Sequence, residues 1–179
     1  MLRNTDKEFG LVSKLLHWGM ALHIFAMLIF GTYIANMKVG FDNLHLFDWH
    51  KASGLIALVL VLARLGWRYY SPVPGTLTRG TKPAELLLAH AVHLVLYNVM
   101  ILMPLTGWIA SSAVGLDITF FGLFRIPFIA PASEATEHLF FTIHGILAYV
   151  LIVAVIIHIA GALKRHFVLK DNTLRRMWF

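Results

Sequence analysis

The sequence predicts an all-α integral membrane protein, a four-helix bundle with both termini in the cytoplasm. Of its 179 residues, 59% are hydrophobic and only 13% are charged, and the mean hydropathy is +0.74, as expected for a membrane protein rather than a soluble domain. Four apolar runs are each long enough to cross a hydrocarbon core of about 30 Å as a helix. No room remains for a separate soluble domain, so residues 1–179 are expected to form a single domain.

The first two spans are expected at about residues 14–37 and 49–70. After its first residue, the first run contains no Asp, Glu, Lys or Arg, and its length and histidines favour a span over a cleaved secretory signal. Arg64 and Arg68 lie near the end of the second span, where long cationic side chains can reach the membrane interface. The proline-rich segment 71–75 then stops the helix.

The third and fourth spans are expected at about residues 83–111 and 137–166. The third opens with a proline, which suits the first turn of a helix because its missing N–H is not needed there. Further along, Pro104 and Gly107 are expected to kink this helix or loosen its end. The aromatic and proline-rich segment 115–133 is expected to be a connection or an interfacial segment.

An even number of spans places both termini on one side of the membrane. Twelve of the 15 lysines and arginines are expected on that side: Arg3, Lys7, Lys14, Arg64, Arg68, Arg79, Lys82, Lys164, Arg165, Lys170, Arg175 and Arg176. Only Lys38, Lys51 and Arg125 remain for the opposite side, so the positive-inside rule predicts cytoplasmic termini. The same distribution accounts for the net charge of +6 without a nucleic-acid partner.

The histidines are the most unusual feature of the composition. The chain has ten of them and no cysteine, which excludes disulfides, thiolate-bound iron–sulfur clusters and covalently attached haem c. Several histidines fall inside the apolar runs, where polar groups are costly and usually functional. Any redox cofactor must therefore be held by ligands other than thiolates.

Four of these histidines form two pairs at matched depths in the expected topology. His17 opens the first span and His158 closes the fourth on the side of the termini, whereas His50 and His144 open the second and fourth spans on the opposite side. His144 and His158 are separated by almost four helical turns, so they share a face and differ in height by about 21 Å. The fourth span therefore contributes to both pairs.

Neutral imidazole is a good axial ligand for haem iron, and two such ligands favour electron transfer over oxygen binding. We therefore expect two b haems, one held by each pair. One alternative is that these histidines only pack against neighbouring helices. Small residues near the pairs would, however, leave room for a flat macrocycle, and these are Gly19, Gly54, Gly145 and Gly161. A metal-ion transporter is another alternative, although no Asp or Glu lies within the four apolar cores.

A quinone site is expected on the side of the termini. His90 and His93 share one face near the start of the third span, beside the pair of His17 and His158. A histidine can donate to a quinone carbonyl and carry the proton that accompanies quinone reduction, and a hydrogen bond to a haem propionate or a neighbouring helix is the alternative. Arg165 and His166 lie at the same surface, where contacts with propionates or lipid headgroups compete with a quinone role.

The other polar candidates have simpler interpretations. Lys51 could pair with a propionate of the outer haem or attract superoxide, or simply reach the interface. His23 is about 240° around the helix from His17, so it is expected to be a packing residue. His45 and His138 are expected in loops or at the interface.

The residues behind these expectations resemble the bacterial cytochrome b561 family over nearly the whole chain. The similar segments are Leu16-His17-Trp18, residues 50–54, residues 89–94, His144 with His158, and residues 170–177. The resemblance implies a di-haem protein of the bacterial inner membrane in which His17 and His158 bind one haem and His50 and His144 bind the other. One activity in the family is superoxide oxidase, in which superoxide from the periplasm gives its electron to haem and then to ubiquinone, and the quinone site includes a histidine matching His93.

The resemblance also leaves a second function open, because the family includes electron-transfer subunits that dock on a dehydrogenase or a periplasmic cytochrome. Our leading interpretation is a superoxide:ubiquinone oxidoreductase in the lipid of the inner membrane, with electrons entering at the outer haem and leaving at the inner one. The alternative is a non-catalytic relay between the quinone pool and a separate periplasmic redox donor. A haem-free membrane protein is a third possibility, and it predicts no visible spectrum.

Overall fold

Four long helices dominate the protein, as expected. The computed structural model describes residues 1–77 and 80–179, so Arg79, counted above among the cations near the termini, lies outside the described residues. All four helices are long and apolar enough to cross a membrane, which confirms the four-helix membrane fold. They are α1 (Leu11–Ala35), α2 (Leu44–Tyr70), α3 (Pro83–Ala113) and α4 (Glu134–Phe167).

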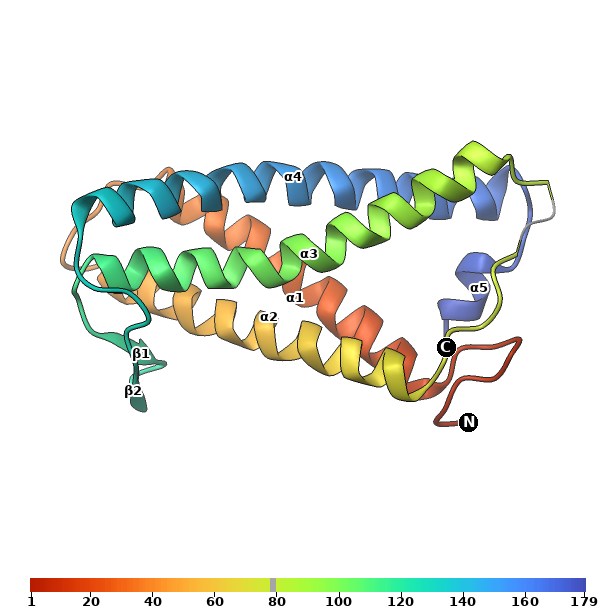
Figure 1. Ribbon diagram of the computed structural model, residues 1–179, viewed down its shortest axis with the longest axis horizontal. Coiled ribbons are helices and arrows are strands. Elements are labelled where there is room, and N and C mark those ends of the chain that lie inside the picture. The colour runs from red at the N-terminus through yellow and green to blue at the C-terminus, as the bar shows by residue number, and fades with distance from the viewer. Residues whose placement is uncertain (78–79) are drawn as a thin grey trace.

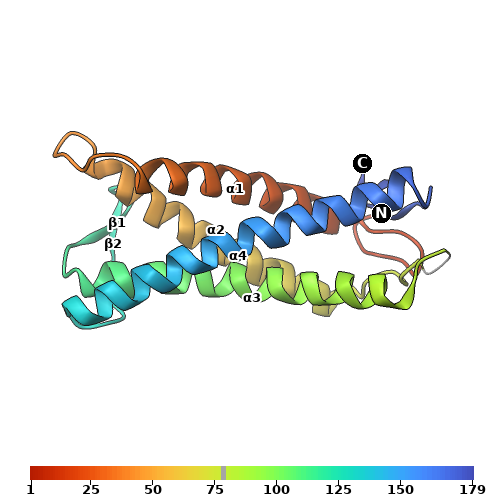
Figure 2. The ribbon, with the colours of Figure 1, turned by 90° about the horizontal axis from the view of Figure 1, so that it is seen from above.

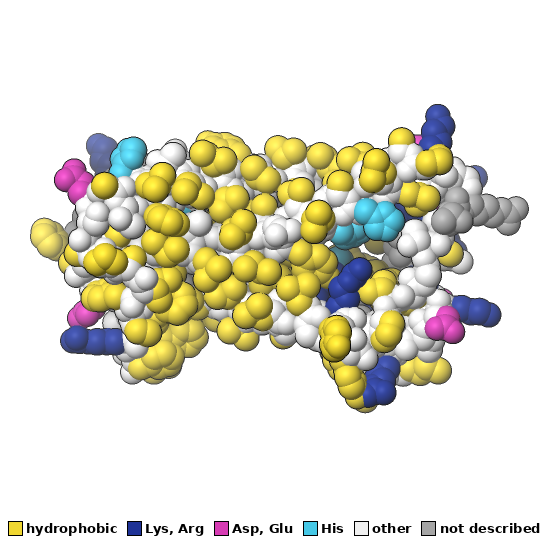
Figure 3. Space-filling model, viewed as in Figure 1, with side chains coloured by type: hydrophobic (Ala, Val, Ile, Leu, Met, Phe, Trp, Pro, Cys, Tyr) yellow, Lys and Arg dark blue, Asp and Glu magenta, His cyan; other side chains and the backbone are white. Residues whose placement is uncertain are grey.

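The helices lie roughly along one direction, with both chain ends at the same end of the bundle (Figures 1 and 2). We call this end the terminal side and the opposite end the loop side. Helix α3 packs mainly on α4, while α2 packs on both α1 and α3. Apolar side chains cover the middle of the bundle and charged side chains gather towards its two ends (Figure 3), the distribution that a bilayer requires.

Local signals explain where the helices begin. Helix α3 opens with Pro83 in its first turn. Helix α4 starts at Glu134, before the expected span, because the hydroxyl of Ser133 caps it by accepting a hydrogen bond of 3.3 Å from the Thr136 backbone N–H. Glu134 and Glu137 add negative charge to its first turn, where the helix dipole favours it.

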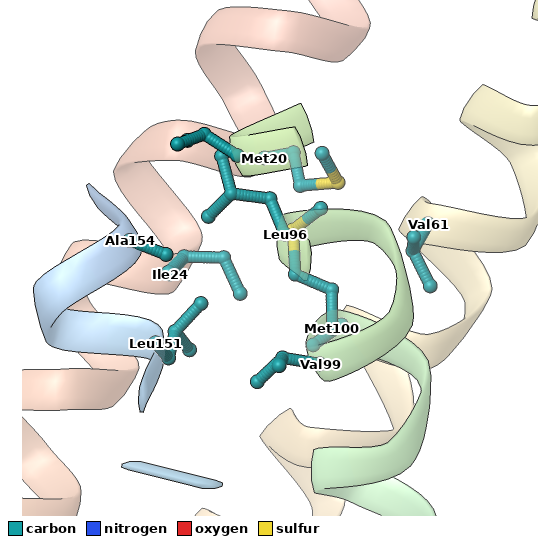
Figure 4. Packing of buried hydrophobic residues seen from close by; sticks show 10 residues of the cluster. Met20, Ile24, Val61, Leu96, Val99, Met100, Leu151 and Ala154 are labelled. Atoms are coloured by element: carbon teal, nitrogen blue, oxygen red, sulfur yellow. The ribbon is translucent and has the colours of Figure 1, made fainter. Parts of the chain in front are cut away.

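A layer of buried apolar side chains fills the middle of the bundle (Figure 4). It contains Met20, Ile24, Ala57, Val61, Val92, Leu96, Val99, Met100, Leu151 and Ala154. Helix α3 continues through Pro104 to Ala113 and changes direction along its length (Figure 1), as expected for a helix in which a proline removes one backbone hydrogen bond.

The connection between α3 and α4 contains a small hairpin that we did not expect. Strand β1 (Ile118–Phe120) pairs with β2 (Phe124–Ile126) in antiparallel register. Phe121 and Gly122 have φ values of 49° and 77°, and the Leu123 backbone N–H donates to the Phe120 carbonyl over 2.9 Å. Two successive positive φ values are the signature of a tight hairpin turn, which glycine accommodates at no steric cost.

A short helix, α5 (Thr173–Met177), was also not expected, and it turns back against the terminal side of the bundle (Figure 1). The Trp18 indole Nε1 donates to the Met177 carbonyl over 2.8 Å, and the ring packs edge-on against Trp178. The buried Arg176 donates from Nη1 to the Gly75 carbonyl over 3.0 Å. The C-terminal segment therefore braces α1 beside His17 and the connection after α2.

Replacing Arg176 with alanine is expected to destabilise the terminal side. The substitution leaves the Gly75 carbonyl without its charged donor, and such hydrogen bonds contribute about 1.5–3 kcal/mol. We expect a lower midpoint of thermal unfolding for the detergent-purified protein. The control is Arg175→Ala, which removes the same charge from an exposed neighbour, and equal midpoints for the two variants would contradict this role for Arg176.

Candidate functional site

The structure brings the four intramembrane histidines together in the two expected pairs. The ring centroids of His17 and His158 lie 6.1 Å apart on the terminal side, and those of His50 and His144 lie 6.3 Å apart on the loop side. We call these pairs the terminal-side site and the loop-side site. On α4, the buried residues Leu151 and Ala154 (Figure 4) lie between His144 and His158 along the chain.

Both spacings fit two imidazoles on opposite sides of one metal ion. Bonds of about 2 Å from each imidazole nitrogen to a metal place the two ring centroids about 6 Å apart. The ring planes are inclined at 58° on the terminal side and 80° on the loop side, and axial ligation permits both because each ring can rotate about its bond to the metal.

The pairs suit a metal that brings its other ligands with it. Within residues 1–77 and 80–179, no group of three or more His, Asp or Glu side chains is arranged to hold a bare metal ion. Haem iron needs only one or two ligands from the protein, because the porphyrin supplies four nitrogens. Two facing histidines are therefore a suitable donor set for haem.

At the loop-side site, a neighbouring backbone carbonyl orients the ring of His144. Nδ1 of His144 lies 3.0 Å from the Met103 carbonyl oxygen and 3.3 Å from the hydroxyl of Thr106. A carbonyl can only accept, so Nδ1 carries the ring proton and Nε2 keeps its lone pair for a metal, an arrangement typical of metal-binding histidines. Nδ1 of His50 is buried and has no hydrogen-bond partner in the described part of the chain.

Glycines make room around these rings. A Cβ at Gly31 would stand 3.1 Å from the His50 ring, and one at Gly107 would stand 3.1 Å from the His144 ring. These two contacts were not among our sequence predictions, since they depend on which helix faces which. The glycines that we named from the sequence were Gly19, Gly54, Gly145 and Gly161. A Cβ at any of these four would meet no atom of the described structure within 4 Å, apart from its own local backbone.

The terminal-side site contains a cation that we expected at the membrane interface. Arg64 is half-buried, and its Nη2 lies 2.9 Å from Nδ1 of His17. The contact with His17 was not among our sequence predictions for Arg64, whereas Arg68, one turn further along α2, is exposed. The contact between Arg64 and His17 depends on which face of α2 is turned towards α1. The spacing of residues in the sequence does not show this, so the contact could not be predicted.

The four quinone candidates have different surroundings. The His93 ring packs edge-on against His158 with 5.1 Å between centroids, whereas Nδ1 of the exposed His90 donates to the Leu86 carbonyl over 2.8 Å. Arg165 forms an ion pair with Asp171 at 2.6 Å. It also donates to Thr173, Thr81 and Leu77, so it holds the C-terminal segment against the loop before α3.

His166 lines a cavity of about 420 Å³ at the terminal side. The other lining residues are Leu174, Arg175, Trp178 and Phe179. Its Nδ1 is buried and has no hydrogen-bond partner among the described residues. The structure thus brings His93 next to the histidine pair and places His166 against the C-terminal tail.

The remaining candidates lie apart from the two pairs or are already engaged. Lys51, next to His50, forms an ion pair with Asp48 at 3.3 Å. Nε2 of His23 donates to the Ser53 carbonyl over 2.9 Å, which makes His23 a contact between α1 and α2. His45 packs on Trp49, and His138 lines a cavity near the start of α4.

Comparison with known proteins identifies the family to which the chain is similar. Residues 8–179 match the family model of prokaryotic cytochrome b561. The chain is 31% identical to "Cytochrome b561 homolog 2" of Escherichia coli (strain K12) over 97% of this chain and 93% of the relative. It is 33% identical to "Cytochrome b561 homolog 1" of the same organism, with 73% of each chain covered. It is also 32% identical to "Probable superoxide oxidase CybB" of Yersinia pestis, with 72% of each chain covered.

These matches confirm the resemblance that the sequence motifs predicted. The family model covers almost the whole chain, including all four long helices. Membership also implies haem b as the cofactor, which agrees with the donor set of the two histidine pairs. The chain therefore belongs to the prokaryotic cytochrome b561 family, whose members are membrane proteins that transfer electrons.

Proposed function

We propose that this protein is a di-haem b cytochrome of the bacterial inner membrane that oxidises superoxide on the periplasmic side and reduces ubiquinone on the cytoplasmic side. The observation that carries the proposal is the pair of facing histidine sites at opposite ends of one bundle, each with the spacing of two axial ligands. The terminal side is assigned to the cytoplasm because most cations lie there.

In this proposal His17 and His158 hold one haem, and His50 and His144 hold the other. A haem held by two imidazoles would supply one-electron transfer and would have no open position for oxygen. The Met103 carbonyl fixes the ring of His144 by accepting from its Nδ1. The apolar layer between the sites keeps water and ions out of the middle of the bundle.

His93 is the residue that we propose to contact the quinone. It is exposed on α3 and also packs against His158, so it lies between the terminal-side site and the lipid from which a quinone would arrive. Two superoxide ions lose one electron each and become two molecules of dioxygen, and one quinone gains both electrons and two protons. A histidine beside the quinone carbonyl can deliver one of those protons.

The test is an assay of the purified protein alone, with superoxide generated enzymatically and a soluble ubiquinone as the acceptor. We expect quinol to form at a rate that depends on the protein concentration, with recovery of one dioxygen for each superoxide consumed. Superoxide dismutase should suppress the reaction, and heat-denatured protein should not support it. A protein that holds its haems but gives no quinol above the uncatalysed rate would contradict the substrate assignment.

The charges on the loop side favour a second candidate function, a relay that receives electrons from a basic partner protein. Five acids lie there, Asp42, Asp48, Asp117, Glu134 and Glu137, against Lys38, Lys51 and Arg125. Two of the cations are already paired with acids, Lys51 with Asp48 and Arg125 with Asp117. Such a surface repels superoxide and attracts cationic proteins, so a relay should be reduced by a basic cytochrome and not by superoxide.

Replacing His93 with alanine is expected to slow quinone reduction without loss of haem. Removing a positioned proton donor commonly lowers a rate by about 10²–10⁴-fold, so we expect at least a tenfold fall in the turnover rate at saturating quinone. The haem content should stay at the wild-type value. The matched variant is His90→Ala, because His90 lies on the same face of α3 but donates to the Leu86 carbonyl, and an equal effect of both variants would contradict a specific role for His93.

A further inference from the structure

Arg64 is a half-buried cation in the terminal-side site with no carboxylate partner in the described part of the chain. The ion pairs of the described residues involve Lys51, Lys164, Arg125 and Arg165, each with an Asp or Glu. The guanidinium of Arg64 instead lies 2.9 Å from Nδ1 of His17 and 5.7 Å from the centroid of the Tyr97 ring. A charge in such a place normally requires a counter-ion.

The contact with His17 cannot persist when that histidine binds a metal through Nε2. A guanidinium can only donate hydrogen bonds, so in the present arrangement Nδ1 of His17 accepts and Nε2 carries the ring proton. Ligation through Nε2 leaves the proton on Nδ1, and two donors would then face each other. Arg64 would need another acceptor beside the same ring.

Haem supplies such acceptors, because its two propionates are carboxylates on an otherwise apolar macrocycle. Arginine is also well suited to bind carboxylates, since its planar fork can donate two parallel hydrogen bonds. His17 and Arg64 each lie six residues from the terminal-side end of their helix, and the charged edge of a macrocycle costs less near the end of a span than at its centre.

We propose that Arg64 binds a propionate of the terminal-side haem and raises the reduction potential of that haem above that of the loop-side haem. The proposal rests on the proposed function only in assuming that each histidine pair holds a haem. Reduction removes one positive charge from the haem, so a nearby cation favours the reduced state. Arg64 thereby makes electron transfer from the loop side to the terminal side favourable.

The experiment is a redox titration of the full-length protein, followed by visible spectroscopy, for the wild type and for Arg64→Gln, Arg64→Lys and Arg68→Gln. Each substitution is repeated with His144→Ala, which leaves only the terminal-side haem, and with His158→Ala, which leaves only the loop-side haem. Arg68→Gln is the matched control, because Arg68 lies one turn away on α2 and near the same Tyr97 ring but is exposed.

We expect Arg64→Gln to shift the reduction equilibrium of the terminal-side haem by about tenfold towards the oxidised state, which is about 59 mV for a one-electron couple. The loop-side haem should keep its potential, and Arg64→Lys should retain most of the wild-type value because it retains the charge. Arg68→Gln should have a much smaller effect because water screens its charge. Loss of the terminal-side haem in Arg64→Gln but not in Arg64→Lys would also support the proposal.

The proposal is overturned if Arg64→Gln keeps both haems at their wild-type potentials. It is also overturned if Arg64→Lys loses the terminal-side haem as readily as Arg64→Gln, since Arg64 would then act through its shape and not its charge. A wild-type protein without haem would contradict the proposed function instead. The two failures are therefore distinguishable.

Discussion

Replacing His158 with alanine should remove one haem and leave the other in place. The substitution deletes one ligand of the terminal-side site, where the rings of His17 and His158 face each other at 6.1 Å, and it leaves the loop-side site of His50 and His144 intact. We expect the haem content to fall from two to one per chain, and superoxide-driven quinone reduction to be abolished. The measurements are the haem-to-protein ratio and the reduced-minus-oxidised spectrum.

The control for this experiment is His23→Ala. His23 is also an intramembrane histidine, but its Nε2 donates to the Ser53 carbonyl and it faces neither site. This variant should keep two haems per chain, although it loses one contact between α1 and α2. Retention of two haems by His158→Ala, or loss of both, would contradict the assignment of His158 to one site only.

The second large effect is expected at Gly107, which is not a ligand. A Cβ there would stand 3.1 Å from Cε1 and 3.2 Å from Nδ1 of His144, so a branched side chain must displace the ring. Gly107→Val should break the hydrogen bond from Nδ1 to the Met103 carbonyl and prevent the ring from facing His50. We expect most of the loop-side haem to be lost, while the terminal-side haem keeps its spectrum and potential.

Gly66→Val is the matched control for Gly107→Val. Gly66 also lies inside a long helix, but a Cβ there meets no other atom within 4 Å in the described structure, apart from its own local backbone. Valine lowers helix propensity equally at both positions, so a general weakening of the helix would affect both variants alike. Full haem content in Gly107→Val would show that the ring of His144 has more freedom than the structure indicates.

The sequence predicted the four-helix fold and the pairing of four histidines, because both depend on positions along a helix. Charge-free runs indicate spans, and a rise of about 1.5 Å for each residue places His17 with His158 and His50 with His144. The structure agrees with both pairings in space.

The other contacts across helices were not predicted, because they depend on how each helix is rotated and where it crosses its neighbours. The positions of Gly31 and Gly107 against the histidine rings belong to this class. The contact of Arg64 with His17 belongs to it too, because the usual behaviour of a cation near a helix end gives no information about its neighbours on another helix.

Short elements were missed for a different reason. The hairpin of β1 and β2 has aromatic and β-branched residues around Gly122, a pattern typical of a tight turn. We interpreted the aromatic residues as a sign of the membrane interface instead. Helix α5 has only five residues and is held by contacts such as that of Trp18 with Met177, which no local pattern reveals.

The haem content of the purified wild-type protein tests the central claim most directly. The protein would be extracted in mild detergent, and its haem would be measured by pyridine haemochrome analysis against protein from amino-acid analysis, together with a reduced-minus-oxidised spectrum. Our account predicts two b haems per chain, distinguishable by their potentials. A chain that contains one haem would contradict the two-site arrangement, and a folded chain that contains none would contradict the proposed electron-transfer function.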